Sequence, residues 1–215
     1  MSGPLPVIFM QPTSPTRLIL GSSSVYRQAL LARLQLPFDV LIPAIDETPQ
    51  PHESPTETAL RLARVKAESI AGQVNGPALI IASDQVATVN DVHIGKPGNH
   101  ARALAQLQMM RGRTVVFHSA LCLLDTRAES TTPVQIDNIQ TIVTFRALPD
   151  AELDAYLRRE QPYDCAGSAK NEGLGIALIE SIVSTDPTAL TGLPLISLTS
   201  MLRLAGVAFF GAASP

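Results

Sequence analysis

One aspartate and one lysine stand where the sequence predicts stiff backbone. Residues 79–85 read Leu-Ile-Ile-Ala-Ser-Asp-Gln, a run of small and β-branched residues typical of a buried strand with Asp84 at its end. The next short strand leads to a Gly-Lys-Pro turn that carries Lys96. A carboxylate can activate water or bind a metal ion, and an ammonium can hold a phosphate. For Asp84 alone, the alternative is a turn or capping residue.

Hydroxyl groups and an arginine gather at a predicted strand-to-helix turn. Residues 18–24 read Leu-Ile-Leu-Gly-Ser-Ser-Ser, and leucines at helical spacing predict a helix over residues 25–35. Backbone amides at a helix N-terminus, with the hydroxyls of Ser22 and Ser24 and the guanidinium of Arg27, form a site suited to phosphate. The alternative is that the serines only cap the helix. The pattern GxxxxGK[ST] of a P-loop is absent.

An acidic loop and a strong helix start come next. Residues 38–42 alternate as a strand, and residues 43–54 form a loop that contains Asp46 and Glu47. Loops of this length are often functional, and adjacent carboxylates can hold Mg²⁺ or Mn²⁺. A solvated acidic loop is the alternative. The Ser-Pro-Thr-Glu sequence at 54–57 is a capping box with proline at the first helical position, which predicts a helix extending to about residue 74.

A lysine lies on the apolar face of that second helix. Lys66 is four residues from both Leu62 and Ile70, which belong to the stripe expected to be buried. A lysine in this position either extends along the apolar surface to solvent or reaches inward to a bound anion. Extension to solvent is the usual outcome, and the position alone leaves both directions open.

The rest of the chain completes an α/β pattern. We expect helices over 99–112, 151–159 and after residue 194, and two antiparallel strands over 114–124 and 135–145. Three glycines in nine residues surround a lysine and Glu172 near the end, which lets the backbone approach a ligand or another strand closely, unless this is an ordinary irregular turn. We predict one domain over residues 17–207 with two lobes around a cleft, a loose N-terminal tail over 1–16 and a C-terminal tail over 208–215.

The composition narrows the classes of protein and partner. The chain has 215 residues, of which 46% are hydrophobic and 16% charged, enough for a sizeable core. A net charge of -3 argues against a nucleic-acid polymer as partner. No run approaches the roughly 18 apolar residues of a membrane span, and the first 16 residues lack signal-peptide features. Two cysteines without CxxC spacing indicate a reducing, cytoplasmic setting. The apolar C-terminal tail suggests a homodimer.

Together these motifs resemble those of the Maf-like nucleoside triphosphate pyrophosphatases, over roughly Arg17 to Gly206. The resemblance rests on a Ser-x-Ser-x-x-Arg loop at 22–27, an acidic loop at 46–48, an Arg-Leu-Ala-x-x-Lys-Ala helix at 61–67, Ser-Asp-Gln at 83–85, Gly-Lys-Pro at 95–97 and Gly-Leu-Pro at 192–194. Each motif alone is weak, whereas their shared order is specific. The resemblance implies a mixed twisted sheet flanked by helices, with two lobes around a central cleft.

The same resemblance implies an activity and a set of site residues. Water would attack the α-phosphorus of a nucleoside triphosphate and release the monophosphate and pyrophosphate. Asp84 would be the catalytic carboxylate, as the base or, with Glu47, as a ligand of a divalent Mg²⁺ or Mn²⁺ cofactor. The residues implied to hold the phosphates are Ser22, Arg27, Lys66 and Lys96.

Three further positions bear on the base of the nucleotide. Family members that act on dTTP and UTP usually carry threonine where Gln85 stands, and a Tyr-Gly-Ile-Gln-Gly run near 169–173, so this chain resembles the subgroup that hydrolyses 7-methyl-GTP. Val25 also replaces a usual proline. N7-methylation makes guanine cationic, so an aromatic face at Tyr26 gains a cation–π attraction, and Glu172 can accept the N1 and N2 protons. Tyr26 packing only on its own helix is the alternative.

Two other functions stay open at this point. One is a related pyrophosphatase for dTTP or UTP. The other is a nucleotide-binding regulator with little turnover, against which the complete set of Asp84, Lys66 and Lys96 argues, because binding alone does not require a candidate base.

Overall fold

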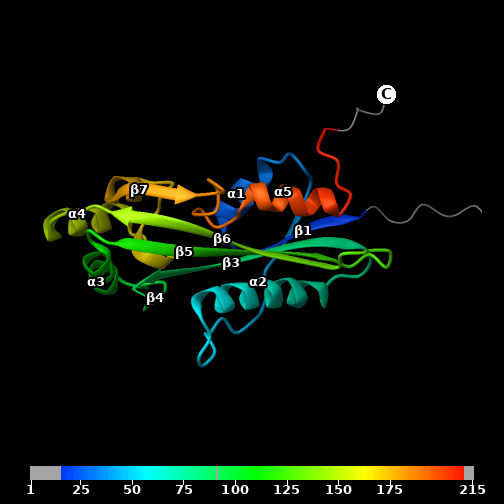
Figure 1. Ribbon diagram of the computed structural model, residues 1–215, viewed down its shortest axis with the longest axis horizontal. Coiled ribbons are helices and arrows are strands. Elements are labelled where there is room, and N and C mark those ends of the chain that lie inside the picture. The colour runs from blue at the N-terminus through cyan, green and yellow to red at the C-terminus, as the bar shows by residue number, and fades with distance from the viewer. Residues whose placement is uncertain (1–15, 91, 211–215) are drawn as a thin grey trace, which may run out of the picture.

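One mixed sheet runs the length of the molecule, with helices on both faces (Figure 1). The computed structural model describes residues 16–90 and 92–210. The loose tail expected over 1–16 therefore lies outside the described residues except for its last residue, and so do residues 211–215 of the expected C-terminal tail.

Seven strands in the described residues form this sheet, in the order β2-β1-β3-β5-β6-β7, with β4 paired to β3. The strands are β1 (Arg17–Gly21), β2 (Asp39–Leu41), β3 (Ala78–Val89), β4 (Val92–Ile94), β5 (Thr114–Asp125), β6 (Val134–Phe145) and β7 (Ile179–Ser184). Strand β1 is parallel to β2 and β3, whereas β3, β5, β6 and β7 are antiparallel to one another in turn. The predicted α/β class with a mixed sheet is confirmed.

Five α-helices and two short 3₁₀ segments accompany the strands in the described residues. They are α1 (Val25–Ala32), α2 (Pro55–Ala71), α3 (His100–Met110), α4 (Asp150–Glu160), η1 (Ala166–Ser168), η2 (Leu174–Leu178) and α5 (Leu195–Leu204). The capping box at the start of α2 is present, with the Ser54 side chain and the Glu57 amide paired and the reverse bond also made. No helix in this part of the chain is both long and apolar enough to cross a membrane.

The side chains of β3 alternate between two cores. Ile80 faces α2 and packs with Ala63 and Ile70, whereas Leu79 and Ile81 face α1 and α5 on the opposite side of the sheet (Figure 1). A third core, around Phe117 and Phe145, lies toward the other end of the sheet beneath α3 and α4. The cores thus divide the molecule into two lobes joined by the long strands.

The sheet has a gap along one edge of β3. Strand β1 pairs with β3 as far as Ile81, and β4 begins pairing only at Ala87. Among the described strands, residues 82–86 consequently pair on one side only, with β5. At this gap β1 ends at Gly21 and the chain turns into α1. Side chains near the middle of β3 are thereby accessible from the edge of the sheet.

Candidate active site

A cleft of about 760 Å³ opens at the gap beside β3. This volume is within the range of small-molecule sites, about 300–1,000 Å³. Both lobes contribute to its walls, as the predicted arrangement requires. Of the site residues predicted from the sequence, all except Asp46 line this cleft, including Ser22, Tyr26, Arg27, Glu47, Lys66, Asp84, Gln85, Lys96 and Glu172.

A buried ion pair lies at the centre of the cleft. Asp84 is in phase with Ile80, so its carboxylate points toward α2, where Lys66 lies on the buried face. The Lys66 Nζ atom donates a hydrogen bond of 2.6 Å to Oδ1 of Asp84 and also lies 2.8 Å from Oε1 of Glu47. Of the two directions that the sequence left open for Lys66, the structure shows the inward one. The ammonium contacts two carboxylates of the protein itself.

Only one of the two adjacent loop acids reaches the cleft. Asp46 turns back on its own loop and accepts a hydrogen bond from the Thr48 amide, whereas Glu47 lines the cleft. Burial would raise the pKa of Glu47, but the hydrogen bond and charge of Lys66, with the charges of Lys96 and Arg27, outweigh burial and leave that pKa lowered. Glu47 is thus held as an anion facing the cations.

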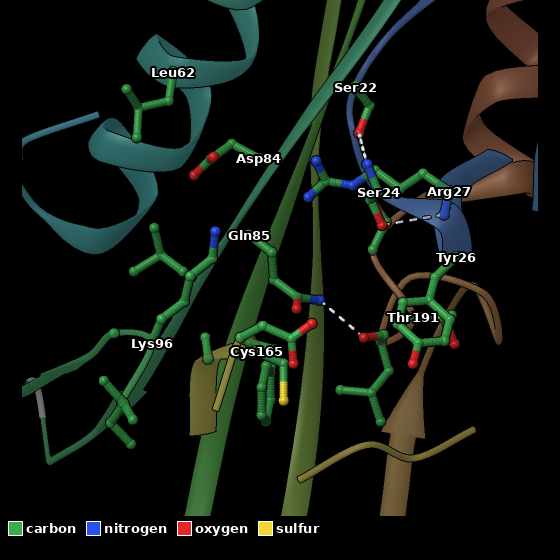
Figure 2. Close-up of a pocket in the computed structure, with 18 of the residues that line it drawn as sticks. Ser22, Ser24, Tyr26, Arg27, Leu62, Asp84, Gln85, Lys96, Cys165 and Thr191 are labelled. Carbon is green, nitrogen blue, oxygen red and sulfur yellow. Dashed lines mark hydrogen bonds between the residues drawn. The ribbon is translucent and has the colours of Figure 1, made fainter. Parts of the chain in front are cut away.

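The side chain of Arg27 spans from helix α1 to a turn near the C-terminus. Its Nε atom donates a hydrogen bond of 2.9 Å to the carbonyl of Gly192. Figure 2 shows the guanidinium directed into the cleft toward Asp84. Burial lowers the pKa of Arg27, and the charges of Asp84 and Glu47 oppose that shift. An arginine remains charged under these conditions, so the cleft keeps a fixed cation at this position.

The serines of the first turn mainly organise the backbone. Ser24 is the N-cap of α1, and its hydroxyl accepts from the Arg27 amide. The buried Ser22 hydroxyl accepts from the Ser24 amide at 3.1 Å. A hydroxyl that accepts one bond can still donate its own hydrogen, so Ser22 combines a capping contact with a position in the cleft wall.

Lys96 is an exposed residue on the opposite wall. It follows β4, and its side chain reaches across the cleft toward Asp84 (Figure 2). Its charge is one of those that lower the pKa of Glu47. Three cations from three different elements, Arg27, Lys66 and Lys96, therefore converge on Asp84.

Gln85 has a more structural environment than the sequence indicated. It alternates to the face opposite Asp84, and its Nε2 atom donates to the carbonyls of Ala189 and Leu190 and to the hydroxyl of Ser119. These bonds hold the turn that presents the carbonyl of Gly192 to Arg27. Gln85 therefore lines the cleft and also anchors the turn that contacts Arg27.

Tyr26 and Glu172 lie in the part of the cleft that Lys170 also lines. Tyr26 is half-buried, and Figure 2 shows its ring on the side of the cleft away from Lys96. Burial of its carboxyl raises the pKa of Glu172, opposed in part by Lys170.

The glycine-rich segment approaches its own backbone. A side chain at Gly175 would collide with the backbone of Lys170, so this glycine lets the segment fold tightly. At Gly175 the close approach expected from the glycine density is present, and it is made to the backbone of the same segment.

Two features that shape the charge of the cleft had no role assigned from the sequence. One is Lys170, whose ammonium lies 3.1 Å from a carboxylate oxygen of Asp164. The other is the carbonyl of Gly192, which accepts from both Arg27 and Ser83. Lys170 stands inside the glycine-rich segment and could have been found there. Gly192 belongs to the Gly-Leu-Pro motif at 192–194, but a backbone carbonyl has no residue-type signal, so its contact with Arg27 could not have been found.

The donor set suits a hard divalent cation. Glu47 and Asp84 both converge on Lys66, so their carboxylates lie around one point of the cleft. No group of three or more potential His, Cys, Asp or Glu ligands occurs among residues 16–90 and 92–210. Mg²⁺ commonly binds one or two carboxylates and takes its other ligands from substrate phosphates and water. The two carboxylates present fit that mode of binding.

The fold and the cleft define an α/β protein equipped to bind a polyanion around a buried carboxylate. The model of the Maf-like protein family matches residues 17–205, and the chain belongs to this family. The resemblance inferred from the ordered motifs is thus confirmed.

Several relatives are similar over nearly the whole chain. A protein of Cupriavidus metallidurans named 7-methyl-GTP pyrophosphatase is 66% identical over 93% of this chain and 100% of its own length. A protein of Burkholderia pseudomallei with the same name is 64% identical over 94% of each chain. A solved structure of a nucleoside-triphosphatase, or dITP/XTP pyrophosphatase, from Mycobacterium abscessus is 17% identical, with a TM-score of 0.40 over 89% of this chain and 95% of that one.

Proposed function

We propose that this protein hydrolyses 7-methyl-GTP, or a closely similar modified nucleotide, to the monophosphate and pyrophosphate. The observation that carries the proposal is the convergence of Arg27, Lys66 and Lys96 on Asp84 within one cleft. Relatives at 64% and 66% identity that bear the name 7-methyl-GTP pyrophosphatase support the choice of substrate.

The cations account for binding of the triphosphate. A triphosphate brings several negative charges, and the transition state of phosphoryl transfer spreads charge over phosphoryl oxygens. Arg27 supplies a planar donor group, fixed through Nε by Gly192. Lys96 supplies an exposed ammonium from the other wall, and Ser22 adds a hydroxyl donor. Because Arg27 and Ser22 are held by hydrogen bonds at the strand-to-helix turn, these two groups are positioned before substrate arrives.

Asp84 is the candidate catalytic residue. One of its oxygens accepts from Lys66, and no other hydrogen bond to its side chain occurs in the described part of the chain. Its second oxygen can therefore accept a proton from a water molecule beside the α-phosphorus. Lys66 in turn fixes the carboxylate at the gap in the sheet.

A divalent cation is part of the proposal. Glu47 and Asp84 would hold it, together with phosphate oxygens of the substrate. When bound, the ion supplies positive charge to the phosphate oxygens and makes a bound water more acidic. Lys66 then has a second use, because its ammonium limits repulsion between the two carboxylates in the free protein.

The far end of the cleft fits a cationic base. The Tyr26 ring offers a π-face to 7-methylguanine, and Glu172 offers a carboxylate to its N1 and N2 protons. The neighbouring Asp164 neutralises Lys170, so the charge of Lys170 opposes a cationic ligand less than an isolated ammonium does.

Pyrophosphate release from a nucleotide panel tests the proposal. The panel is 7-methyl-GTP, GTP, UTP, dTTP and CTP, each with Mg²⁺ or Mn²⁺. We expect the highest kcat/KM with 7-methyl-GTP and no turnover without the metal. A higher kcat/KM with UTP or dTTP would show that the proposed substrate is wrong. Absence of pyrophosphate release from every nucleotide would favour a nucleotide-binding protein without turnover.

We also propose a cytoplasmic setting and a homodimer for the working protein. Cys122 and Cys165 are both free thiols, which suits a reducing compartment. The apolar residues that follow α5 are the proposed contact between protomers. Light scattering at several concentrations measures the mass directly.

A further inference from the structure

The loop that carries Glu47 is fastened to helix α2 on the outside of the cleft. Residues 43–54 contain no helix or strand, so the loop alone does not fix Glu47 opposite Lys66. The carbonyl of Thr48, the next residue, accepts a hydrogen bond of 3.2 Å from Nη2 of Arg61. Arg61 therefore holds the backbone immediately beside Glu47.

Arg61 is itself held by a second residue of the same loop. Its Nε and Nη2 atoms lie 2.5 and 2.8 Å from the two oxygens of Glu53. Glu53 also accepts from the Gln50 amide and from the Thr58 hydroxyl of α2. The Arg61 and Glu53 side chains are only 23% and 9% exposed. Such a two-point pairing needs the planar fork of arginine, which a lysine does not provide.

Arg61 does not belong to the cleft. It lines a shallow hollow on the outer surface with Glu53, whereas the cleft wall in the described residues is formed by others. Arg61 can act on the reaction through the loop to Glu47, and its positive charge also acts at a distance on Asp84. A substitution that keeps the charge therefore isolates the effect of the loop. We propose that Arg61 is a positioning residue of the active site, which fixes Glu47 against Lys66 by holding the carbonyl of Thr48. This inference rests on the proposed function.

A double-mutant cycle tests this dependence. Arg61→Lys keeps the charge but loses the two-point pairing, and we expect kcat/KM for 7-methyl-GTP to fall roughly 10- to 100-fold, as for a misplaced catalytic group. In a Glu47→Gln background the same change should alter kcat/KM less than about twofold, because the residue through which it acts is already lost. Losses that multiply, or full activity of Arg61→Lys, would overturn the proposal.

A matched control and a second readout separate positioning from folding. Arg64 lies on the same helix, is 58% exposed and pairs only with Glu68 among the described residues, so Arg64→Lys should leave turnover unchanged. Without substrate, amide hydrogen exchange at residues 46–48 and 50 should become faster in Arg61→Lys and stay unchanged in Arg64→Lys. Unchanged exchange in Arg61→Lys would overturn the positioning role of Arg61, whether or not the protein is active. Absence of pyrophosphate release by the wild-type protein would instead count against the proposed function.

Discussion

The Nζ atom of Lys66 lies 2.6 Å from Oδ1 of Asp84, and the two side chains are only 7% and 10% exposed. Because Lys66 also contacts Glu47, loss of the Asp84 charge leaves the lysine with a partner. We expect Asp84→Asn to lower kcat at least 100-fold, as for loss of a catalytic base, with little change in the free energy of unfolding. Pyrophosphate release and urea unfolding measure both. Turnover at the wild-type rate would remove Asp84 from the base and metal roles.

The opposite member of the pair should behave differently. Lys66→Met leaves Asp84 buried without the ammonium, and removing one partner of a buried pair costs about 3 kcal/mol. We expect a loss of that size in urea unfolding. Lys96→Met, at an exposed lysine of the same cleft, is the control and should change stability by less than about 0.5 kcal/mol. Similar small effects of both changes would contradict the structural importance of the Lys66 contact.

Glu172 should distinguish between bases. A hydrogen bond to a charged group contributes about 1.5–3 kcal/mol, so Glu172→Gln should lower kcat/KM for 7-methyl-GTP roughly 10- to 100-fold. Turnover of UTP should change much less, because a carboxylate cannot pair in the same way with the N3–H and carbonyls of a pyrimidine. An equal loss on both nucleotides would rule out recognition of guanine by Glu172.

The ring of Tyr26 should favour the methylated base over the ordinary one. A cation–π contact contributes about 0.5–2 kcal/mol, which corresponds to roughly a 2- to 30-fold preference of 7-methyl-GTP over GTP. We expect Tyr26→Leu to lose this preference and Tyr26→Phe to keep it. Steady-state kinetics with the two nucleotides provides the comparison. A preference that survives in Tyr26→Leu would mean that the ring only packs on its helix.

The Arg61–Glu53 pair should contribute to acid sensitivity. The hydrogen bonds from Arg61 are the largest cause that lowers the pKa of Glu53, from 4.5 to about 2. A carboxyl with a lowered pKa in the folded state stabilises it above the unfolded pKa, and this stabilisation is lost as the pH falls from about 4.5 to about 2. Glu53→Gln should be less stable at neutral pH, with a flatter loss of stability across that window in urea unfolding. A curve parallel to that of the wild type would contradict the assignment.

Helices whose first residues have a recognisable capping sequence were predicted correctly from the sequence. The capping box at residues 54–57 identified the start of α2, and Asn99 identified that of α3. Strand β7 was missed, because it pairs along one side only and exposes Ile182 and Val183, so it lacks the alternation of a half-buried strand.

The order of motifs predicted which residues meet, but not how they meet. Arg27 and Gly192 are 165 positions apart, and their contact depends on a backbone carbonyl that any residue possesses. The direction taken by Lys66 was equally open, because it depends on what lies under the helix. Once Asp84 and Glu47 are in place, two carboxylates within hydrogen-bond reach compensate the ammonium for its lost hydration.

Strands β3, β5 and β6 are each 12 residues long and pass without interruption from one lobe to the other. The two lobes are therefore parts of one continuous β-sheet rather than two bodies joined by a hinge. Because continuous ladders of hydrogen bonds join these three strands, opening the cleft would deform all of them together. We expect the width of the cleft to change little when a nucleotide binds. The cleft would then select its nucleotide as a preformed site.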